Sequence, residues 1–261
     1  MDIIAPNDIM YNTLKTSVFE QFPKLKGIPS ERFPHHVLII PDGNGRWAKK
    51  MNSIPIIGHR QGFKVLKKVL RNLQELPIDI VTIWGFAADN WKRPEKEIEE
   101  LMRLFEEGLR DIVPDLIKNK SKFIHLGRKD RIPLSLQNTI KKAEKVSRNN
   151  KGKILCLAID FGGGDQELRI MQAIQKLPKN TNITPELVQE LRDGQGEIPP
   201  ADLIIRTSGE NRTSDIGWLG ANAEFYSIPK LLPDAKMEDF AKAIIDYSKR
   251  ERRFGGRLKN E

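Results

Sequence analysis

The feature that most constrains the fold is an alternation of short apolar runs with stretches of helical periodicity. The runs are rich in valine, isoleucine and leucine, which is typical of strands buried on both faces. They lie at Val37–Ile40, Ile80–Phe86, Lys122–Leu126, Lys153–Phe161 and Leu203–Arg206, with a short sixth run at Ala223–Tyr226. This alternation predicts one α/β domain, in which a mostly parallel central sheet of about six strands is flanked by helices.

Helical periodicity between the runs predicts helices at about 58–75, from Pro94 to beyond 116, at 134–147, from about 165, and at 237–250. The helix after Pro94 has more apolar residues than one stripe requires. Such a helix is either buried on two sides or lines an apolar tunnel, and its residues alone favour the first. No linker or internal repeat interrupts residues 35–250, and residues 1–34 form an N-terminal arm with scattered apolar positions.

The composition narrows the class of partner without choosing one. The chain of 261 residues has a formal net charge of +9, which suits diphosphates, acidic lipid headgroups or nucleic acid. The single cysteine, Cys156, lies inside an apolar run and fits a core thiol in a reducing compartment. The start of the chain has no signal-peptide pattern, and no apolar stretch is long enough to span a bilayer. We therefore expect a cytoplasmic protein whose only membrane contact would be peripheral.

The most informative motif follows the first apolar run, where residues 41–48 read Pro-Asp-Gly-Asn-Gly-Arg-Trp-Ala. Gly43 and Gly45 can turn their backbone N–H groups toward an anion. Arg46 has a planar guanidinium suited to phosphate oxygens, and Asp42 is a hard oxygen ligand of the kind that Mg²⁺ prefers. The segment predicts a site for a magnesium-bound phosphate or diphosphate, although Asp-Gly and Asn-Gly also occur in turns without function.

Three further polar blocks follow predicted strands, at residues 87–94, 160–165 and 206–214. In open parallel sheets, ligands bind beyond the carboxyl ends of the strands, where such loops converge. Convergence would gather Arg46, Arg93, Arg206 and Arg212, which would repel one another unless anions join them. The alternatives are polar surface loops, core tryptophans at 47 and 91, and a helix-start histidine at 59.

At these residues the chain resembles the cis-prenyltransferases, which include undecaprenyl diphosphate synthase. The resemblance is carried by residues 36–48, by Gly-His-Arg-Gln-Gly at 58–62, and by the blocks 86–94, 202–214, 223–224 and 252–256, in the order typical of the family. It implies a cis-prenyltransferase catalytic domain over residues 35–256, with a short C-terminal tail at 257–261. It also favours the second interpretation of the helix after Pro94, in which that helix lines an apolar tunnel.

The resemblance implies that isopentenyl diphosphate is condensed with an allylic diphosphate, such as farnesyl diphosphate, to give a polyprenyl diphosphate lipid carrier. By resemblance, Asp42 is the essential carboxylate that works with Mg²⁺, and Glu224 is a second metal ligand that reaches the site from a partner subunit in a homodimer. Asn90 matches the residue assigned to proton removal, although an amide is a poor base. The implied substrate-binding residues are Gly43, Asn44, Gly45, Arg46, Trp47, His59, Trp91, Arg93, Arg206, Arg212 and Ser214.

The sequence departs from the family pattern at four places. Ala87-Ala88-Asp89 replaces two hydroxyl residues and a glutamate before the Asn-Trp pair, and Gly164 replaces an arginine after the Gly-Gly pair. An arginine usually found shortly before Gly58 is replaced around Pro55, and the stretch 215–222 is one residue short. With these changes we still expect an active enzyme, but its substrate preference is in doubt.

Two other functions compete with chain elongation. The first is a head-to-middle, lavandulyl-type synthase, which the Ala87-Ala88 change motivates. The second is a non-catalytic scaffold subunit, against which the retained Asp42, Arg46 and Asn90 argue. We expect no nucleic acid partner, because the basic residues follow no recognisable binding module. The basic segment Lys249–Arg253 is the part expected to meet phosphate across a dimer or acidic lipid headgroups.

Overall fold

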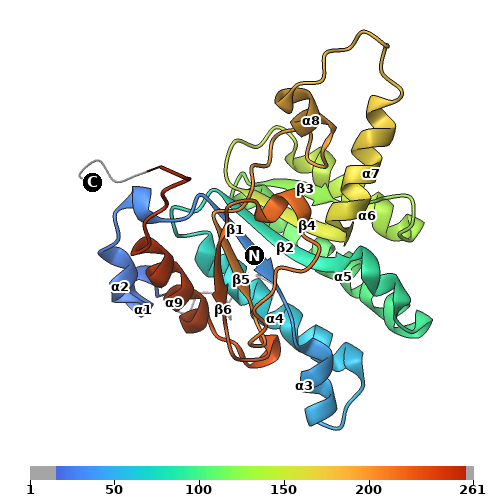
Figure 1. Cartoon of the computed structure of the whole chain (residues 1–261). Coiled ribbons are helices and arrows are strands. Elements are labelled where there is room, and N and C mark those ends of the chain that lie inside the picture. The colour runs from blue at the N-terminus through green and yellow to red at the C-terminus, as the bar shows by residue number, and fades with distance from the viewer. Residues whose placement is uncertain (1–15, 257–261) are drawn as a thin grey trace, which may run out of the picture.

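The computed structural model describes residues 16–256, and its core is a sheet of six strands with helices on both faces (Figure 1). All neighbouring strands are parallel, in the order β3-β4-β2-β1-β5-β6. The strands are β1 (His36–Ile40), β2 (Ile80–Ala87), β3 (Lys122–Leu126), β4 (Ile154–Phe161), β5 (Leu203–Arg206) and β6 (Glu224–Ser227). The predicted α/β class and parallel sheet are therefore confirmed, with each strand within one residue of its expected position.

Four helices cross one face of the sheet. They are α4 (Pro55–Leu73), α5 (Glu95–Lys118), α6 (Leu134–Ser147) and α9 (Met237–Ser248), and they bury two apolar clusters against the strands. The other face buries a separate cluster, which includes Cys156, Phe161 and Leu219. There the sheet is covered by α7 (Gly163–Ile174), the 3₁₀ turn η4 (Gly217–Gly220) and neighbouring loops, with α8 (Pro185–Leu191) against α7. Cys156 is the expected core thiol, because it is free and fully buried.

The chain before β1 also contributes to the core. The described part of the N-terminal arm forms two short helices, α1 (Val18–Gln21) and α2 (Pro23–Lys26), and a 3₁₀ turn, η2 (Ser30–Arg32). Val18 and Leu25 are fully buried in the cluster beneath α4 and α9. Residues 1–15 of the arm and the tail at 257–261 lie outside the described residues. Among the described helices, none combines the length and apolar character that crossing a membrane requires.

Two helix starts differ from the sequence expectation. Helix α4 begins at Pro55 rather than near Gly58, because a proline is well suited to the first helical position. Pro94 precedes α5 as its N-cap, with an extended ψ of 135°, so Glu95 is the first helical residue. Pro114 lies inside α5.

Like α1 and α2, two short helices after β1 were not predicted. Helix α3 (Asn44–Lys50) begins within the Asp42 motif, and α8 lies in the segment between α7 and β5. The remaining short turns are η3 (Ala88–Lys92), after β2, and η5 (Leu232–Asp234), after β6.

Candidate active site

The site is built at the carboxyl edge of the two central strands β1 and β5. Ile40 is paired with Arg206 in the parallel register, so the loop after β1 lies directly beside the end of β5. Asp42 comes two residues after β1, and its Oδ2 accepts a hydrogen bond from Nη2 of Arg206 at 2.9 Å. The hydroxyl of Thr207 donates to the backbone carbonyl of Asp42 at 2.7 Å and fixes the position of the loop.

The arginines at this edge are bridged by carboxylates. Oδ1 of Asp42 accepts from Arg46 at 3.0 Å, and Arg46 also donates to Glu210 at 2.8 Å. Glu210 forms a further ion pair with Arg212. The result is an alternating series of charges, Arg206–Asp42–Arg46–Glu210–Arg212, which we call the ion-pair chain. The expected gathering of Arg46, Arg206 and Arg212 is thus observed, with Asp42 and Glu210 as the anions between them.

Burial and hydrogen bonding have opposite effects on the ionisation of Asp42, which is paired with Arg206. Arg206 is 5% exposed, and a second nitrogen donates to Ser214 Oγ at 2.9 Å and to the Arg212 carbonyl at 2.6 Å. Partial burial favours the neutral form of Asp42, but the hydrogen bonds from Arg206 and Arg46 outweigh it and hold the pKa of Asp42 below its usual value. Asp42 is therefore a carboxylate at neutral pH.

Gly43 is required by the shape of this loop. Its φ of +101° is in the left-handed region, where a side chain is strained. A Cβ at this position would also lie 2.3 Å from the hydroxyl of Ser208 and 2.8 Å from the side chain of Leu231. The glycine lets the chain turn from β1 into α3 while it packs closely against the loops after β5 and β6.

A second polar group faces the site from α4 and α5. His59 on α4 lies 3.7 Å from Glu97 on α5, and Arg93 donates to the same carboxylate oxygen at 3.3 Å. Burial, with a smaller contribution from Arg93, lowers the pKa of His59 to about 4. His59 is therefore neutral at pH 7 and acts there as a hydrogen-bonding group rather than as a cation.

The loop after β2 is held from behind by a buried carboxylate. Asn90 Oδ1 accepts from the backbone N–H of Ala87 at 3.1 Å. The indole nitrogen of Trp91 donates to Asp160 Oδ1 at 2.8 Å, and Arg131 donates to Oδ2 of Asp160 at 2.8 Å. Asp160 is fully buried and has a positive φ of +56°. Asp160, near the end of β4, thereby fixes the position of Trp91 beside Asn90.

A cavity of about 320 Å³ connects the polar groups to an apolar space beneath α4 and α5. Phe63, on α4, stands over Gly108 of α5, where an added Cβ would lie 2.5 Å from its ring. Phe105, on α5, stands over Gly85 of β2, where an added Cβ would lie 2.9 Å from its ring. The cavity is lined by polar residues of the site (Asp42, Asn44, His59, Asn90, Arg93, Arg206 and Ser214) and by apolar residues that include Phe63, Leu66, Leu70, Leu101, Leu104, Phe105, Leu109 and Ile112.

Several predicted residues lie outside the cavity lining. Arg46 and Arg212 belong to the ion-pair chain, and Trp91 packs edge-on against Phe86. Trp47 donates from its indole nitrogen to Asp234 at 2.8 Å. Each therefore has a partner within the protein next to the site.

Glu224 is not brought to Asp42 within this chain. It pairs with Leu203 at the start of β5, whereas Arg206, which binds Asp42, is three residues further along that strand. Three strand residues correspond to roughly 10 Å. Oε2 of Glu224 accepts from Arg250 at 2.7 Å. Its role as a metal ligand stays a prediction that needs a second subunit.

Sequence reasoning missed two carboxylates of the site. Glu210 lies in the polar block at 206–214, whereas Glu97 lies in the first turn of α5, where the helix dipole alone favours an acidic residue. The available signal was the predicted crowding of arginines, since gathered cations require counter-charges. Neither glutamate lines the cavity, whose acidic lining residues within the described part of the chain are Asp42, Asp89 and Asp215.

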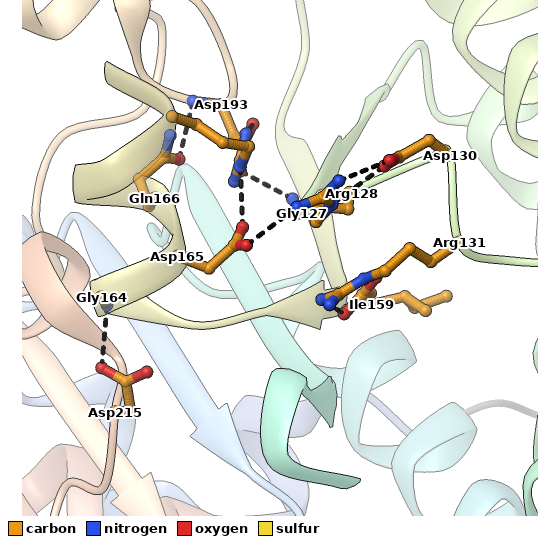
Figure 2. Close-up of polar contacts among 12 residues, drawn as sticks. Gly127, Arg128, Asp130, Arg131, Ile159, Gly164, Asp165, Gln166, Asp193 and Asp215 are labelled. Carbon is orange, nitrogen blue, oxygen red and sulfur yellow. Dashed lines mark hydrogen bonds and ion pairs between the residues drawn. The ribbon is translucent and has the colours of Figure 1, made fainter. Parts of the chain in front are cut away.

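The loop after β4 has a different character from the Asp42 loop (Figure 2). The carboxylate of Asp215 accepts from the backbone N–H of Gly164 at 3.2 Å, at the first turn of α7. Arg128 donates to Asp165 at 3.2 Å and also pairs with Asp130. Positive charge in this region is therefore committed to ion pairs of the protein.

The donor groups fit magnesium only in part. Mg²⁺ is commonly bound by one or two carboxylates together with substrate phosphates and water. Asp42 supplies one ionised carboxylate at the cavity, which suits that mode. No group of three or more acidic, histidine or cysteine side chains that could hold a metal occurs within residues 16–256. A metal ion held here would depend on ligands from the substrate.

Comparisons with known proteins agree with this architecture. The sequence pattern of the family described as putative undecaprenyl diphosphate synthase matches residues 40–255. An isoprenyl transferase from Bacillus cereus is 36% identical over 92% of this chain and 99% of its own length. One from Fusobacterium nucleatum is 38% identical over 87% of this chain and 97% of its own length.

Two solved structures share the fold. The lavandulyl diphosphate synthase of Lavandula x intermedia, in complex with dimethylallyl diphosphate, matches with a TM-score of 0.81 and 32% identity over 86% of this chain and 99% of that one. A probable undecaprenyl diphosphate synthase from Campylobacter jejuni matches with a TM-score of 0.70 and 24% identity, over 85% of this chain and 98% of that one, and supports the fold alone.

A parallel sheet with a charged carboxyl edge above an apolar cavity suits a ligand in which an anionic group is joined to an apolar chain. The extent of the sequence matches makes the assignment more specific. The chain belongs to the undecaprenyl diphosphate synthase family of isoprenyl transferases, and it is a prenyltransferase.

Proposed function

We propose that this protein is a Mg²⁺-dependent cis-prenyltransferase that condenses isopentenyl diphosphate with an allylic diphosphate, such as farnesyl diphosphate, to give a polyprenyl diphosphate lipid carrier. The observation that carries the proposal is the position of Asp42 and Arg206, which lie where the polar edge of the sheet meets the apolar cavity. A prenyl diphosphate has a matching polar part and apolar part, since its highly charged head is joined to a hydrocarbon chain.

In this proposal the loop 42–46 holds the allylic diphosphate. Breaking the allylic C–O bond builds negative charge on the leaving diphosphate, and the guanidinium of Arg46 and the backbone N–H groups of the loop stabilise it. Mg²⁺, when bound at Asp42, would neutralise part of that charge. The apolar walls beneath α4 and α5 keep water away from the cationic hydrocarbon end and would form the tunnel for the growing chain.

The loop after β5 holds the isopentenyl diphosphate in this proposal. Arg206 and Ser214 already contact each other, and Arg212 lies at the end of the same ion-pair chain. The side-chain oxygen of Asn90 is engaged by the backbone N–H of Ala87, which leaves its NH₂ group to orient a substrate oxygen. We assign the lost proton to the departing diphosphate, because an amide is a poor base.

A specific observation favours a second candidate, a head-to-middle coupling of two five-carbon units. The lavandulyl diphosphate synthase gives the higher TM-score of the two structures described above. Ala87 and Ala88 also remove hydroxyls from the loop that lines the cavity. Altered contacts to the allylic group could change which carbon atoms are joined.

One experiment separates these functions. The full-length protein is incubated with Mg²⁺, farnesyl diphosphate and labelled isopentenyl diphosphate, and the products are sized by mass spectrometry. A ladder of five-carbon additions that ends in a long product supports elongation. A ten-carbon product from dimethylallyl diphosphate alone would replace it with the head-to-middle reaction. No turnover with either substrate would favour a scaffold subunit.

A further inference from the structure

The helices α3 and α4 form the most one-sidedly charged segment around the site. Residues 43–74 contain no aspartate or glutamate. In a chain with 35 acidic and 44 basic residues, so long an interval without an acid is a marked local excess of positive charge. The segment contains eight basic residues: Arg46, Lys49, Lys50, Arg60, Lys64, Lys67, Lys68 and Arg71.

Part of this charge is neutralised by other elements, and part is free. Four of the eight are paired with carboxylates outside the segment: Arg46, Arg60, Lys67 and Arg71. Lys49 and Lys50, at the end of α3, are exposed and form no ion pair within the described part of the chain, and the same holds for Lys64 and Lys68 along α4. The free charge is therefore concentrated at the end of α3 and on the exposed side of α4.

The turn that joins these helices also exposes aliphatic side chains. We call residues 49–57 the α3–α4 tip, and it projects from the body at the bottom of the view in Figure 1. Met51 is 57% exposed, Ile54 is 60% exposed and Ile57 is 44% exposed. Large apolar side chains grouped at a projecting turn, next to unpaired lysines, are the combination that binds the interface of a bilayer.

We propose that the α3–α4 tip docks on the surface of an anionic lipid bilayer. Met51 and Ile54 enter the boundary between headgroups and acyl chains, while Lys49 and Lys50 contact lipid phosphates. A second copy of this surface would meet its own positive charge, which disfavours self-association through the tip. A nucleic acid would match the lysines but would gain nothing from the exposed isoleucines.

The position of the tip relates docking to the site. Helix α3 begins at the Gly43 turn and has seven residues, so the tip lies roughly 10 Å from the Asp42 loop. Helix α4 begins at the tip and supplies Phe63 and Leu66 to the wall of the cavity. Docking would therefore bring the cavity close to the bilayer, where a long-chain product would be released. The proposal does not depend on the proposed reaction, because it is tested without substrates.

The first test changes the charge. Full-length protein is sedimented with vesicles of phosphatidylcholine alone or with added phosphatidylglycerol, at low and high salt. We expect binding only to the anionic vesicles and weaker binding at high salt. The variant Lys49→Gln/Lys50→Gln should bind on the order of tenfold more weakly. The matched control is Lys141→Gln/Lys142→Gln, an exposed lysine pair on α6 that also forms no ion pair within residues 16–256.

The second test changes the apolar contact. Ile54→Ser is compared with Met171→Ser on α7, because both side chains are 60% exposed. We expect a several-fold loss of vesicle binding for Ile54→Ser and none for Met171→Ser. The thermal unfolding midpoint of each variant checks that the fold is retained.

Three outcomes would overturn the proposal. In the first, the wild-type protein does not bind the anionic vesicles. In the second, binding survives both tip variants, which would assign it to another surface such as the basic segment Lys249–Arg253. In the third, single-stranded RNA competes for the same lysines more strongly than the vesicles do. A failed prenyl transfer assay with intact vesicle binding would reject the proposed reaction alone.

Discussion

The two halves of the sheet's carboxyl edge use their charges differently. In the β1–β5 half, Arg206 and Asp42 line the cavity. In the β3–β4 half, Arg131 and Arg128 are bound to Asp160 and Asp165, and neither arginine lines the cavity. The two halves therefore differ in what a ligand can reach, because only a charge that faces the cavity is available to it. Ala87 and Ala88 belong to the end of β2 and its following loop, between the two halves, and line the cavity, whereas Gly164 follows β4.

The largest effect should come from Asp42, in the β1–β5 half. Asp42→Asn keeps the shape of the side chain but removes the charge that two arginines and a metal ion would share. We expect kcat to fall on the order of 10²–10³-fold. Steady-state kinetics with saturating substrates and Mg²⁺ measures this change.

The matched control is Asp234→Asn, which alters a neighbouring carboxylate that accepts from Trp47 and does not line the cavity. Its kcat should stay within a few-fold of the wild type. If Asp42→Asn lost less than tenfold, the catalytic role assigned to this half would be wrong.

The next effect should be on stability in the β3–β4 half. Arg131→Met leaves the fully buried Asp160 without its guanidinium partner. We expect a loss of ~3 kcal/mol in the free energy of unfolding, because an uncompensated buried charge is costly. Urea denaturation provides the measurement.

Two variants support the assignment of that loss. Arg131→Met/Asp160→Asn should recover part of the stability, because the buried charge is gone. Arg71→Met removes an exposed pair with Asp115 on α5 and should change the free energy of unfolding by less than ~0.5 kcal/mol. Equal losses for Arg71→Met and Arg131→Met would remove the distinction between structural and surface charge.

These expectations depend on features that the sequence predicts unequally. The six strands could be placed because their apolar runs are continuous, and the meeting of Asp42 with Arg206 follows from the rule that parallel strands end at one edge. Helix α3 could not be predicted, because its first residues Asn44 and Gly45 are poor helix residues and the helix depends on its packing against α4. The bridging by Glu210 depends on side-chain rotamers, which no spacing in the sequence encodes.

A third prediction concerns acid pH and the strand beneath the catalytic half. His36, in β1, is fully buried between the Pro199 carbonyl and the Thr82 hydroxyl. Burial lowers its pKa to about 4 against an ordinary value of 6.5. The folded state is therefore neutral where the unfolded chain takes up a proton, so stability is complete above pH 6.5 and falls as the pH drops toward 4.

This histidine alone should cost ~3 kcal/mol of stability at pH 4 relative to pH 7. Urea denaturation across this range measures the slope, and His36→Gln should reduce it by one proton. His59 and His125 have pKa values lowered to about 4 in the same way, so part of the slope remains in the variant. An unchanged slope in His36→Gln would mean that His36 is not the titrating group.

The smallest effect should come from restoring a hydroxyl in the loop after β2, where the sequence departs from the family pattern. Ala88 lines the cavity, and Ala88→Ser would give a diphosphate oxygen one more hydrogen-bond donor. We expect KM for the allylic diphosphate to fall a few-fold, with kcat and stability nearly unchanged. A change of product length instead would mean that this loop controls the coupling geometry and not the affinity.

The two glycines beneath the phenylalanine rings have a consequence for how the family can diversify. A Cβ at Gly85 or Gly108 would lie less than 3 Å from the ring of Phe105 or Phe63, so the ring would have to shift, and both rings line the cavity. Gly108 does not itself line that cavity, so its influence would be invisible in a comparison of lining residues alone. Single substitutions at these glycines would thus change the shape of the apolar space, while the charged edge stays unchanged. A lineage could in this way alter the size of hydrocarbon that it accepts without rebuilding its catalytic groups.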